Sequence, residues 1–163
     1  GAETNARAVC VHPIEESIWV VGDTTGDLNV GGPSIGSRDL FVSMYNQAGD
    51  KLWTKQVGQN SSQTFGLGCA IEWSGASYGY VSGKTYANLG GSGNGFPDAV
   101  VTKYDSQGSE IWLRQFKAAG SSSAYDVTFD ISTSTVWAVG YTEGSMLSQT
   151  QTGLTDCLLL SIS

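Results

Sequence analysis

A short sequence pattern recurs three times along this chain of 163 residues. In each copy an apolar run ends in glycine, a polar Gly-rich stretch follows, and an aspartate then opens a second apolar run. Successive glycines are 61 and 57 residues apart. A regular period of this size is typical of repeat proteins, whose units bury their apolar faces against one another. The repeated positions are Gly22 with Asp39, Gly83 with Asp98, and Gly140 with Asp156.

Each unit divides into four short strands, which we call a, b, c and d, with turn residues between them. Strand c is a nearly continuous apolar run, which is typical of a strand covered on both faces by neighbouring sheets. The third unit ends before a strand d, so the sequence predicts an all-β fold of 11 strands in a single domain, residues 1–163. The predicted units are 8–66, 67–124 and 125–163, with strands at 8–11, 17–22, 40–45 and 51–57; at 67–71, 78–83, 99–104 and 110–116; and at 125–131, 135–140 and 157–162.

The connections differ in length and chemistry. The c–d turns, 46–50 and 105–109, are short and carry glycine at the same place, which predicts hairpins with that glycine at positive φ. The b–c connections, 23–38, 84–97 and 141–155, are long, polar and Gly-rich, so we expect them at the surface.

Composition supports many short strands and argues against several classes of partner. Charged residues make up only 14% of the chain and glycine contributes 22 residues, whereas a helical bundle needs more Glu, Lys, Ala and Leu. The net charge is −7 and there is no basic cluster, so neither nucleic acid nor an anionic membrane surface is an expected partner. No apolar run approaches the roughly 20 residues that membrane insertion requires.

The second unit reads Tyr-Val-Ser-Gly-x-Thr and then Phe-Pro-Asp-Ala-Val-Val-x-Lys-Tyr-Asp-x-x-Gly-x-x-x-Trp across residues 80–112. This pattern resembles the SBBP-type β-propeller repeat of secreted and cell-surface proteins. The likeness covers nearly the whole chain from Ala8, although the third copy lacks Phe-Pro and strand d. The resemblance implies three propeller-type blades of four antiparallel strands, the last without its outer strand. It implies no fixed activity, since the family is defined by its scaffold.

Fewer than three full blades make a partial propeller, because closed propellers typically need at least four. We consider three ways to cover the exposed blade faces and the free strand edge: a larger propeller of which this is a segment, closure by self-association, or end-to-end stacking in which a neighbour supplies the missing strand. The start at Gly1 and the stop at Ser163 in mid-blade favour a segment or an assembly.

The cysteines and one glycosylation triplet bear on the compartment. Cys10 and Cys69 are 59 residues apart, and Thr128 lies another 59 residues on, so small buried side chains at equivalent positions explain them better than a disulfide. Asn60, followed by Ser61 and Ser62, is a predicted acceptor for N-glycosylation. We expect an extracellular or cell-surface protein.

Candidate catalytic and metal-binding residues have simpler structural interpretations. A ring formed by the three repeated aspartates would suit metal or acid/base chemistry, but identical placement in every unit favours hydrogen bonds to turn amides. His12, the single histidine, precedes Pro13 and is expected to be a solvated turn residue. Residues 22–29 faintly resemble a calcium loop without its full spacing, and residues 90–95 lack the features of a phosphate loop. We predict no catalytic, cofactor or metal residues.

The aromatic residues suggest packing at most positions. Trp19, Tyr80 and Trp137 are equivalent in the repeat, as are Trp53 and Trp112, which favours contacts between blades. Trp73 breaks this pattern beside the second a–b turn and is the candidate for an exposed ligand contact.

The sequence therefore predicts a non-catalytic extracellular structural or interaction protein, one that assembles with itself or with flanking β-propeller blades in a larger propeller or filament. The alternative is a carbohydrate-binding module that uses the long b–c loops and exposed aromatics, with glycans as its partners.

Overall fold

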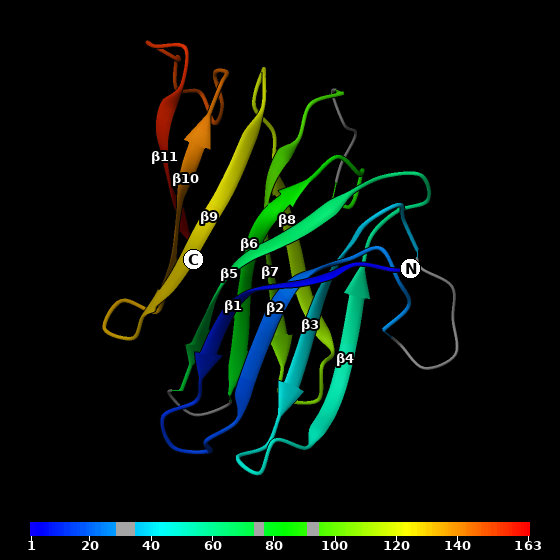
Figure 1. The fold of residues 1–163 in the computed structure, drawn as a ribbon. Helices are drawn as coiled ribbons and strands as arrows, with labels where there is room; N and C mark the ends of the chain where they lie inside the picture. Colours follow the sequence, from blue (N-terminus) through cyan, green and yellow to red (C-terminus); the bar gives the residue numbers. More distant parts are fainter. Residues whose placement is uncertain (29–34, 74–76, 91–94) are drawn as a thin grey trace.

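The computed structural model describes residues 1–28, 35–73, 77–90 and 95–163. These residues form 11 β-strands and no helix, arranged as three antiparallel sheets (Figure 1). The strand order is β1-β2-β3-β4 in sheet 1, β5-β6-β7-β8 in sheet 2 and β9-β10-β11 in sheet 3. The all-β prediction, the count of 11 strands and the absence of a fourth strand in the last sheet are confirmed for the described residues.

Each predicted strand corresponds to an observed one. Strand a starts earlier than predicted and strand b ends later. Pairs such as Thr4↔Thr24 and Thr64↔Thr85 extend the hydrogen-bonded ladder there, and these polar residues do not show the apolar pattern by which a strand is recognised in a sequence. The strands are β1 Thr4–Val11, β2 Ile18–Thr24, β3 Asp39–Tyr45 and β4 Lys51–Val57; β5 Thr64–Glu72, β6 Tyr78–Thr85, β7 Asp98–Asp105 and β8 Glu110–Phe116; and β9 Ser122–Asp130, β10 Thr135–Thr142 and β11 Asp156–Ile162.

The same close approach of two backbones requires the glycine that ends the first apolar run in every unit. Strand a carries a one-residue irregularity beside this glycine in all three sheets, between Ala6 and Ala8 in sheet 1. It brings the backbone of strand a against strand b. A Cβ on the glycine would lie closer to a strand a carbonyl oxygen than the 3.0 Å that real Cβ atoms keep. The glycines and the carbonyls they face are Gly22 and Asn5, Gly83 and Phe65, and Gly140 and Ser123.

The c–d turns also follow the prediction. Gly49 has φ of 87° and Gly108 has φ of 77°, so both glycines adopt the left-handed conformation that L residues avoid. Each turn is closed by a backbone hydrogen bond to the first residue of the turn, from Gly49 N to Asn46 O and from Gly108 N to Asp105 O.

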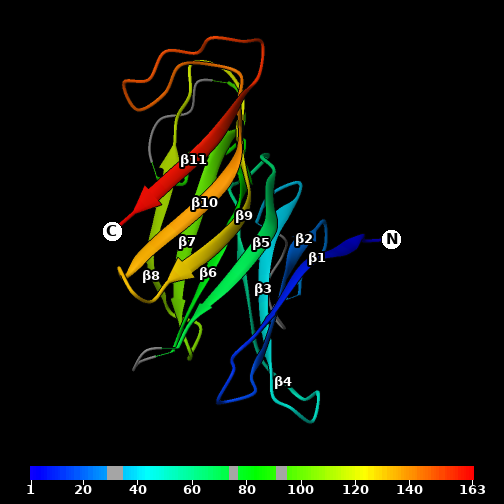
Figure 2. The same cartoon turned by 90° about the vertical axis from the view of Figure 1, so that its left-hand side faces the viewer.

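The three sheets stack face to face in chain order. Strand a of each sheet lies beside strand a of the next, and Figure 2 shows β9, β5 and β1 following one another across the molecule. We call the face of a sheet that looks toward the next sheet its forward face, and the opposite face its back face. One core joins the forward face of sheet 1 to the back face of sheet 2, and a second core joins sheet 2 to sheet 3 in the same way. The first core contains Trp19, Val21, Leu40, Val42 and Met44 with Val81 and Tyr104; the second contains Tyr80, Ala99 and Val101 with Ala124, Val127, Val136, Ala138, Leu158, Leu160 and Ile162.

In sheets 1 and 2 the repeated aromatic residues pack between the sheets, as predicted. The Trp19 ring lies over Gly79 of sheet 2 and meets Trp53 edge-on, with ring centroids 5.0 Å apart. Tyr80 takes the same place in the second interface and stacks on Phe129 at 5.6 Å. Aromatic side chains from the forward faces of sheets 1 and 2 therefore fill both interfaces between sheets.

The prediction for Cys10 and Cys69 is wrong, because the two residues form a disulfide between sheets 1 and 2 with Cα atoms 6.0 Å apart. Cys10 pairs with Trp19 in its sheet, whereas the residue paired with the equivalent Tyr80 is Ala70. Cys69 is therefore offset by one residue from the position equivalent to Cys10. A one-residue offset turns a strand side chain to the opposite face, so the cysteines face each other across the interface.

The prediction for His12 is also wrong. Its side chain is buried, with 3% of its surface exposed. The Nδ1 atom accepts hydrogen bonds from the backbone N–H groups of Ile14 and Glu15, and Nε2 lies 3.0 Å from the Ser77 hydroxyl in the second unit. Tertiary contact between two a–b turns, absent from local sequence, explains this burial.

Strand c differs among the sheets. Nearly all of β3 and β7 is buried, as predicted for strands covered on both faces. In β11 burial alternates instead: Leu158, Leu160 and Ile162 are buried, and Cys157 and Leu159 are exposed. The prediction fails for the forward face of β11, because no described segment lies over it.

Candidate interaction surfaces

The repeated aspartates are held by the ends of the b–c connections. Asp39 accepts hydrogen bonds from the N–H groups of Ile35 and Gly36 at 2.8 and 2.7 Å. Asp156 makes the same bonds with the residues four and three positions before it, Thr152 and Gly153, at 2.8 and 3.0 Å. The structural interpretation is confirmed for both, since a carboxylate that accepts backbone N–H bonds fixes a turn.

A glutamine on strand d completes this arrangement in sheets 1 and 2. The Gln56 amide donates to Asp39 and to the Gly26 carbonyl, and its oxygen accepts from Leu28 N–H at 2.6 Å. Gln115 repeats the pattern, donating to Asp98 at 2.8 Å and to the Ala87 carbonyl, and accepting from the N–H groups of Leu89 and Gly90. Sequence reasoning missed these glutamines, although their 59-residue spacing was a visible signal.

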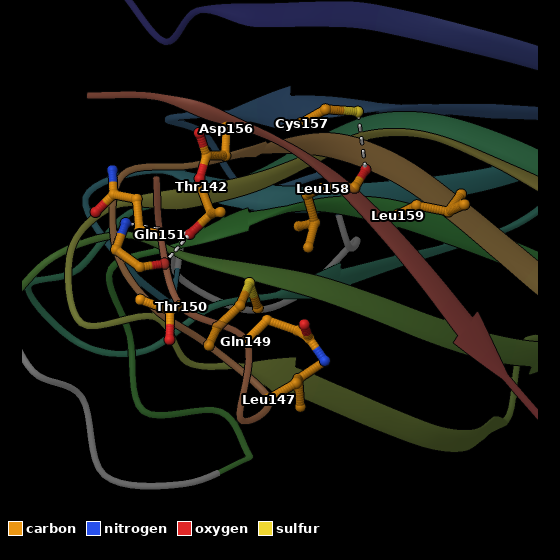
Figure 3. A pocket seen from close by; sticks show the side chains of 11 residues that line it. Thr142, Leu147, Gln149, Thr150, Gln151, Asp156, Cys157, Leu158 and Leu159 are labelled. Atoms are coloured by element: carbon orange, nitrogen blue, oxygen red, sulfur yellow. Dashed lines mark hydrogen bonds between the residues drawn. The ribbon is translucent and has the colours of Figure 1, made fainter. Parts of the chain in front are cut away.

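In sheet 3 the corresponding place is a hollow of about 290 Å³ (Figure 3). It lies where the third b–c connection meets β11, the strand that has no outer neighbour among the described strands. Thr142, Gly144 and Asp156 in its wall hold the positions that Thr24, Gly26 and Asp39 hold in sheet 1. The hollow is lined by Thr142, Gly144, Met146, Leu147, Gln149, Thr150, Gln151, Asp156, Cys157, Leu158 and Leu159.

The forward face of sheet 3 is an exposed apolar surface. Val139 is 44% exposed and Leu159 is 61% exposed, while the equivalent residues of sheet 1, Val21 and Val42, are completely buried against sheet 2. The free thiol of Cys157 lies on the same face, and Trp137 is half-buried there beside a small hollow. The predicted contact of Trp137 with a neighbouring blade is absent among the described residues, where no sheet lies against it.

The back face of sheet 1, at the other end of the stack, is open along β1, whereas Phe41 and Ser43 of β3 on the same face are buried. Val9 is 65% exposed and Val11 is 56% exposed, at positions where sheet 2 carries Cys69 and Ile71 against sheet 1. A hollow of about 280 Å³ lies on this face between Ala6, Val20 and Tyr45, among others. The stack therefore ends in a partly exposed back face on sheet 1 and an exposed forward face on sheet 3.

Residues 22–29, weighed above as a calcium loop, use their first carboxylate internally, and Asn29 lies outside the described residues. The Asp23 side chain is completely buried and forms ion pairs with Arg7, at 2.7 Å, and with Arg38, while Asn5 donates a further hydrogen bond. Burial raises the pKa of Asp23, but these hydrogen bonds outweigh it and hold the pKa below its ordinary value. Within the described ranges no group of three His, Cys, Asp or Glu side chains is arranged to hold a metal ion.

We expect Asp23→Asn to lower the free energy of unfolding by about 3 kcal/mol at pH 7, because it leaves two guanidinium groups without their carboxylate. Since the folded-state pKa of Asp23 is lowered, its contribution is present above the unfolded-state pKa and is lost as the pH falls through the folded value. The difference between the two proteins should therefore shrink toward about pH 2. Urea unfolding at both pH values measures it, and equal stability at pH 7 would contradict the assigned role.

The two residues singled out as site candidates lie apart. Trp73 is 46% exposed at the end of β5, and Asn60 is exposed in the turn between β4 and β5. Strand a runs from the b–c end of its sheet to the a–b end, so Trp73 and the b–c connections lie at opposite ends of the strands and do not form one site. In the second b–c connection the exposed aromatics are Tyr86 and Phe96; residues 91–94 of the Gly-rich stretch 90–95 are outside the described residues.

No helix within the described ranges is long and apolar enough to cross a membrane. Comparison with protein-family models and with curated proteins finds no match for this chain.

Proposed function

We propose that this chain is a non-catalytic extracellular structural or interaction protein, built from propeller-type blades, that joins further blades of the same kind through its two open sheet faces. The blades come from other copies of the chain or from flanking repeats. The observation that carries this proposal is the apolar forward face of sheet 3, which is exposed at Val139 and Leu159. The forward faces of sheets 1 and 2 are each covered by the next sheet.

The internal interfaces indicate which surface fits the open forward face. In both of them a forward face packs on the back face of the following sheet. Leu40 of the forward face lies close to the small Gly66 of sheet 2, and sheet 1 offers Ala6 at the position of Gly66. The back face of sheet 1 therefore has a matching small residue to accept Cys157, which holds the position of Leu40.

Head-to-tail contact between such faces either closes a ring or continues as a filament. Two copies would bring six sheets around one axis, within the roughly four to eight blades of closed propellers.

The Cys10–Cys69 disulfide supports an oxidising compartment.

Self-association is tested by light scattering over a range of concentrations. We expect the mass to rise above 17.1 kDa, toward about twice that value if two copies close a ring. A protein that stays at the monomer mass at every concentration would contradict assembly as its function.

A cysteine pair tests the geometry of the contact. Thr128 holds the position of Cys10 on the forward face of sheet 3, and Val9 holds that of Cys69 on the back face of sheet 1. In a Cys157→Ser background, Thr128→Cys mixed with Val9→Cys should give a disulfide-linked heterodimer on a nonreducing gel. Thr128→Cys mixed with Val11→Cys is the matched control, since Val11 lies two residues further along the same face. Equal cross-linking of both mixtures would contradict this docking geometry.

Carbohydrate binding stays an alternative prediction. Tyr86 and Phe96, both about half exposed on the second b–c connection, are the aromatic residues that favour it. A glycan array without saturable binding would exclude this function.

A further inference from the structure

The outer edge of β11 is unpaired within the described chain. In sheets 1 and 2 strand c lies between strand b and strand d, so β3 pairs with β4 and β7 pairs with β8. Among the described strands, β11 pairs with β10 alone. An unpaired strand edge presents backbone N–H and C=O groups to any extended segment of matching length.

The hollow beside this edge lies at the place that a strand d glutamine occupies in sheets 1 and 2. In sheet 1 the Gln56 amide occupies the corresponding place and bonds to Asp39, to the Gly26 carbonyl and to Leu28 N–H. In sheet 3 the counterparts are Asp156, Gly144 and Met146, and all three line the hollow, where Figure 3 labels Asp156. The Met146 N–H already donates to the Gln149 carbonyl, so the counterparts left for a glutamine are the Asp156 carboxylate and the Gly144 carbonyl. The wall thus offers a carboxylate and a carbonyl at the places where a strand d glutamine donates hydrogen bonds.

A second position on strand d also makes a contact across units. Trp53, three residues before Gln56, donates a hydrogen bond from Nε1 to the Ser106 carbonyl in the second unit at 2.9 Å. Trp112 lies three residues before Gln115 and is tilted against Tyr80, with ring centroids 6.0 Å apart. Strand d therefore carries tryptophan and glutamine at a fixed spacing in both complete sheets.

We propose that the outer edge of β11 and the adjoining hollow form a binding site for an extended peptide segment that carries an aromatic residue followed three positions later by glutamine. The segment pairs antiparallel with β11 as a fourth strand, a mode of recognition known as β-augmentation. Its glutamine donates to Asp156 and to the Gly144 carbonyl, and its backbone completes the ladder. This site uses the edge of β11, whereas the contact proposed above uses the forward face, although Cys157 and Leu159 border both. Light scattering tests the face-to-face contact by itself, and peptide labelling tests the edge.

The register predicts which peptide residue lies opposite Cys157. Val57 pairs with Leu40 and Phe116 pairs with Ala99, and Cys157 holds the position of Leu40 and Ala99. The peptide residue that follows the glutamine therefore faces Cys157 on the forward side. Directly opposed residues in antiparallel strands have Cα atoms about 4.5–5.5 Å apart, within the range that a disulfide spans.

The test uses a peptide with the sequence of residues 108–118 in which Phe116→Cys introduces a thiol, supplied as its mixed disulfide with 2-mercaptoethanol. The Cys157 thiolate attacks the peptide sulfur, a protein–peptide disulfide forms and 2-mercaptoethanol leaves with the proton. We expect mass spectrometry of the full chain to show labelling at Cys157, which is a free cysteine. The Cys157→Ser protein is the control for the attachment point.

Two control peptides make the result decisive. A Gln115→Leu version retains the cysteine but loses the hydrogen bonds in the hollow, and we expect it to label about tenfold less at equilibrium. A version with its other residues scrambled should label at the background level. Equal labelling by all three peptides would overturn the proposed site, and equal labelling by the first two alone would overturn the recognition of glutamine. Labelling by a protein that light scattering finds monomeric would support this site while contradicting the assembly proposal.

Discussion

Removal of the disulfide by the paired change Cys10→Ala and Cys69→Ala is expected to lower the free energy of unfolding by about 4 kcal/mol, from the chain entropy that a cross-link between residues 59 apart removes from the unfolded state. The bond also joins two sheets that are held together by apolar contact and by hydrogen bonds such as those of His12 with Ser77 and of Trp53 with Ser106. In a stack where each sheet contacts its neighbours, its loss falls on the first interface.

Urea unfolding of the oxidised protein, the reduced protein and the double variant checks this result. The reduced protein and the double variant should share a lower midpoint. Cys157→Ser is the matched control, because that cysteine is exposed and forms no disulfide, and its change should leave the midpoint nearly unaltered. Identical midpoints for all proteins would show that contact between sheets 1 and 2 suffices without the bond.

The second large effect is expected for Gly83→Ala, which should destabilise the protein by about 3 kcal/mol. A Cβ at this position would meet the Phe65 carbonyl oxygen at the irregularity of β5, and that backbone has to move to admit it. Relief by side-chain motion is excluded, since the obstacle is main chain.

Gly90→Ala is the matched control, because the nearest atoms to its Cβ would be at 3.5 Å, an ordinary contact distance. Thermal unfolding of both variants provides the comparison. We expect Gly22→Ala and Gly140→Ala to behave as Gly83→Ala does, since they face Asn5 and Ser123 in the same way. Equal unfolding temperatures for Gly83→Ala and Gly90→Ala would refute the steric explanation of the repeat.

Much of the fold could be predicted because its determinants are local and occur in every unit. The sequence predicts strand d at residues 51–57 and 110–116, which are the bounds observed for β4 and β8, because a turn with glycine at positive φ fixes the start of the strand. The role of Asp39 and Asp156 followed from identical placement before strand c. The candidate surfaces were predicted less well. The hollow beside β11 is recognised only by comparison with sheets 1 and 2, where Gln56 and Gln115 occupy the corresponding place.

The sequence by itself determined the strands, the period and the residues that turns and close backbone approaches require, since each of these depends on neighbours along the chain. Only the tertiary structure decided which side chains meet across sheets. A one-residue offset in strand a brings Cys69 to face Cys10, the packing of two a–b turns buries His12, and the end of the stack exposes Leu159. Alternation tells which residues share a face of a strand, whereas the position of the neighbouring sheet decides whether that face is covered.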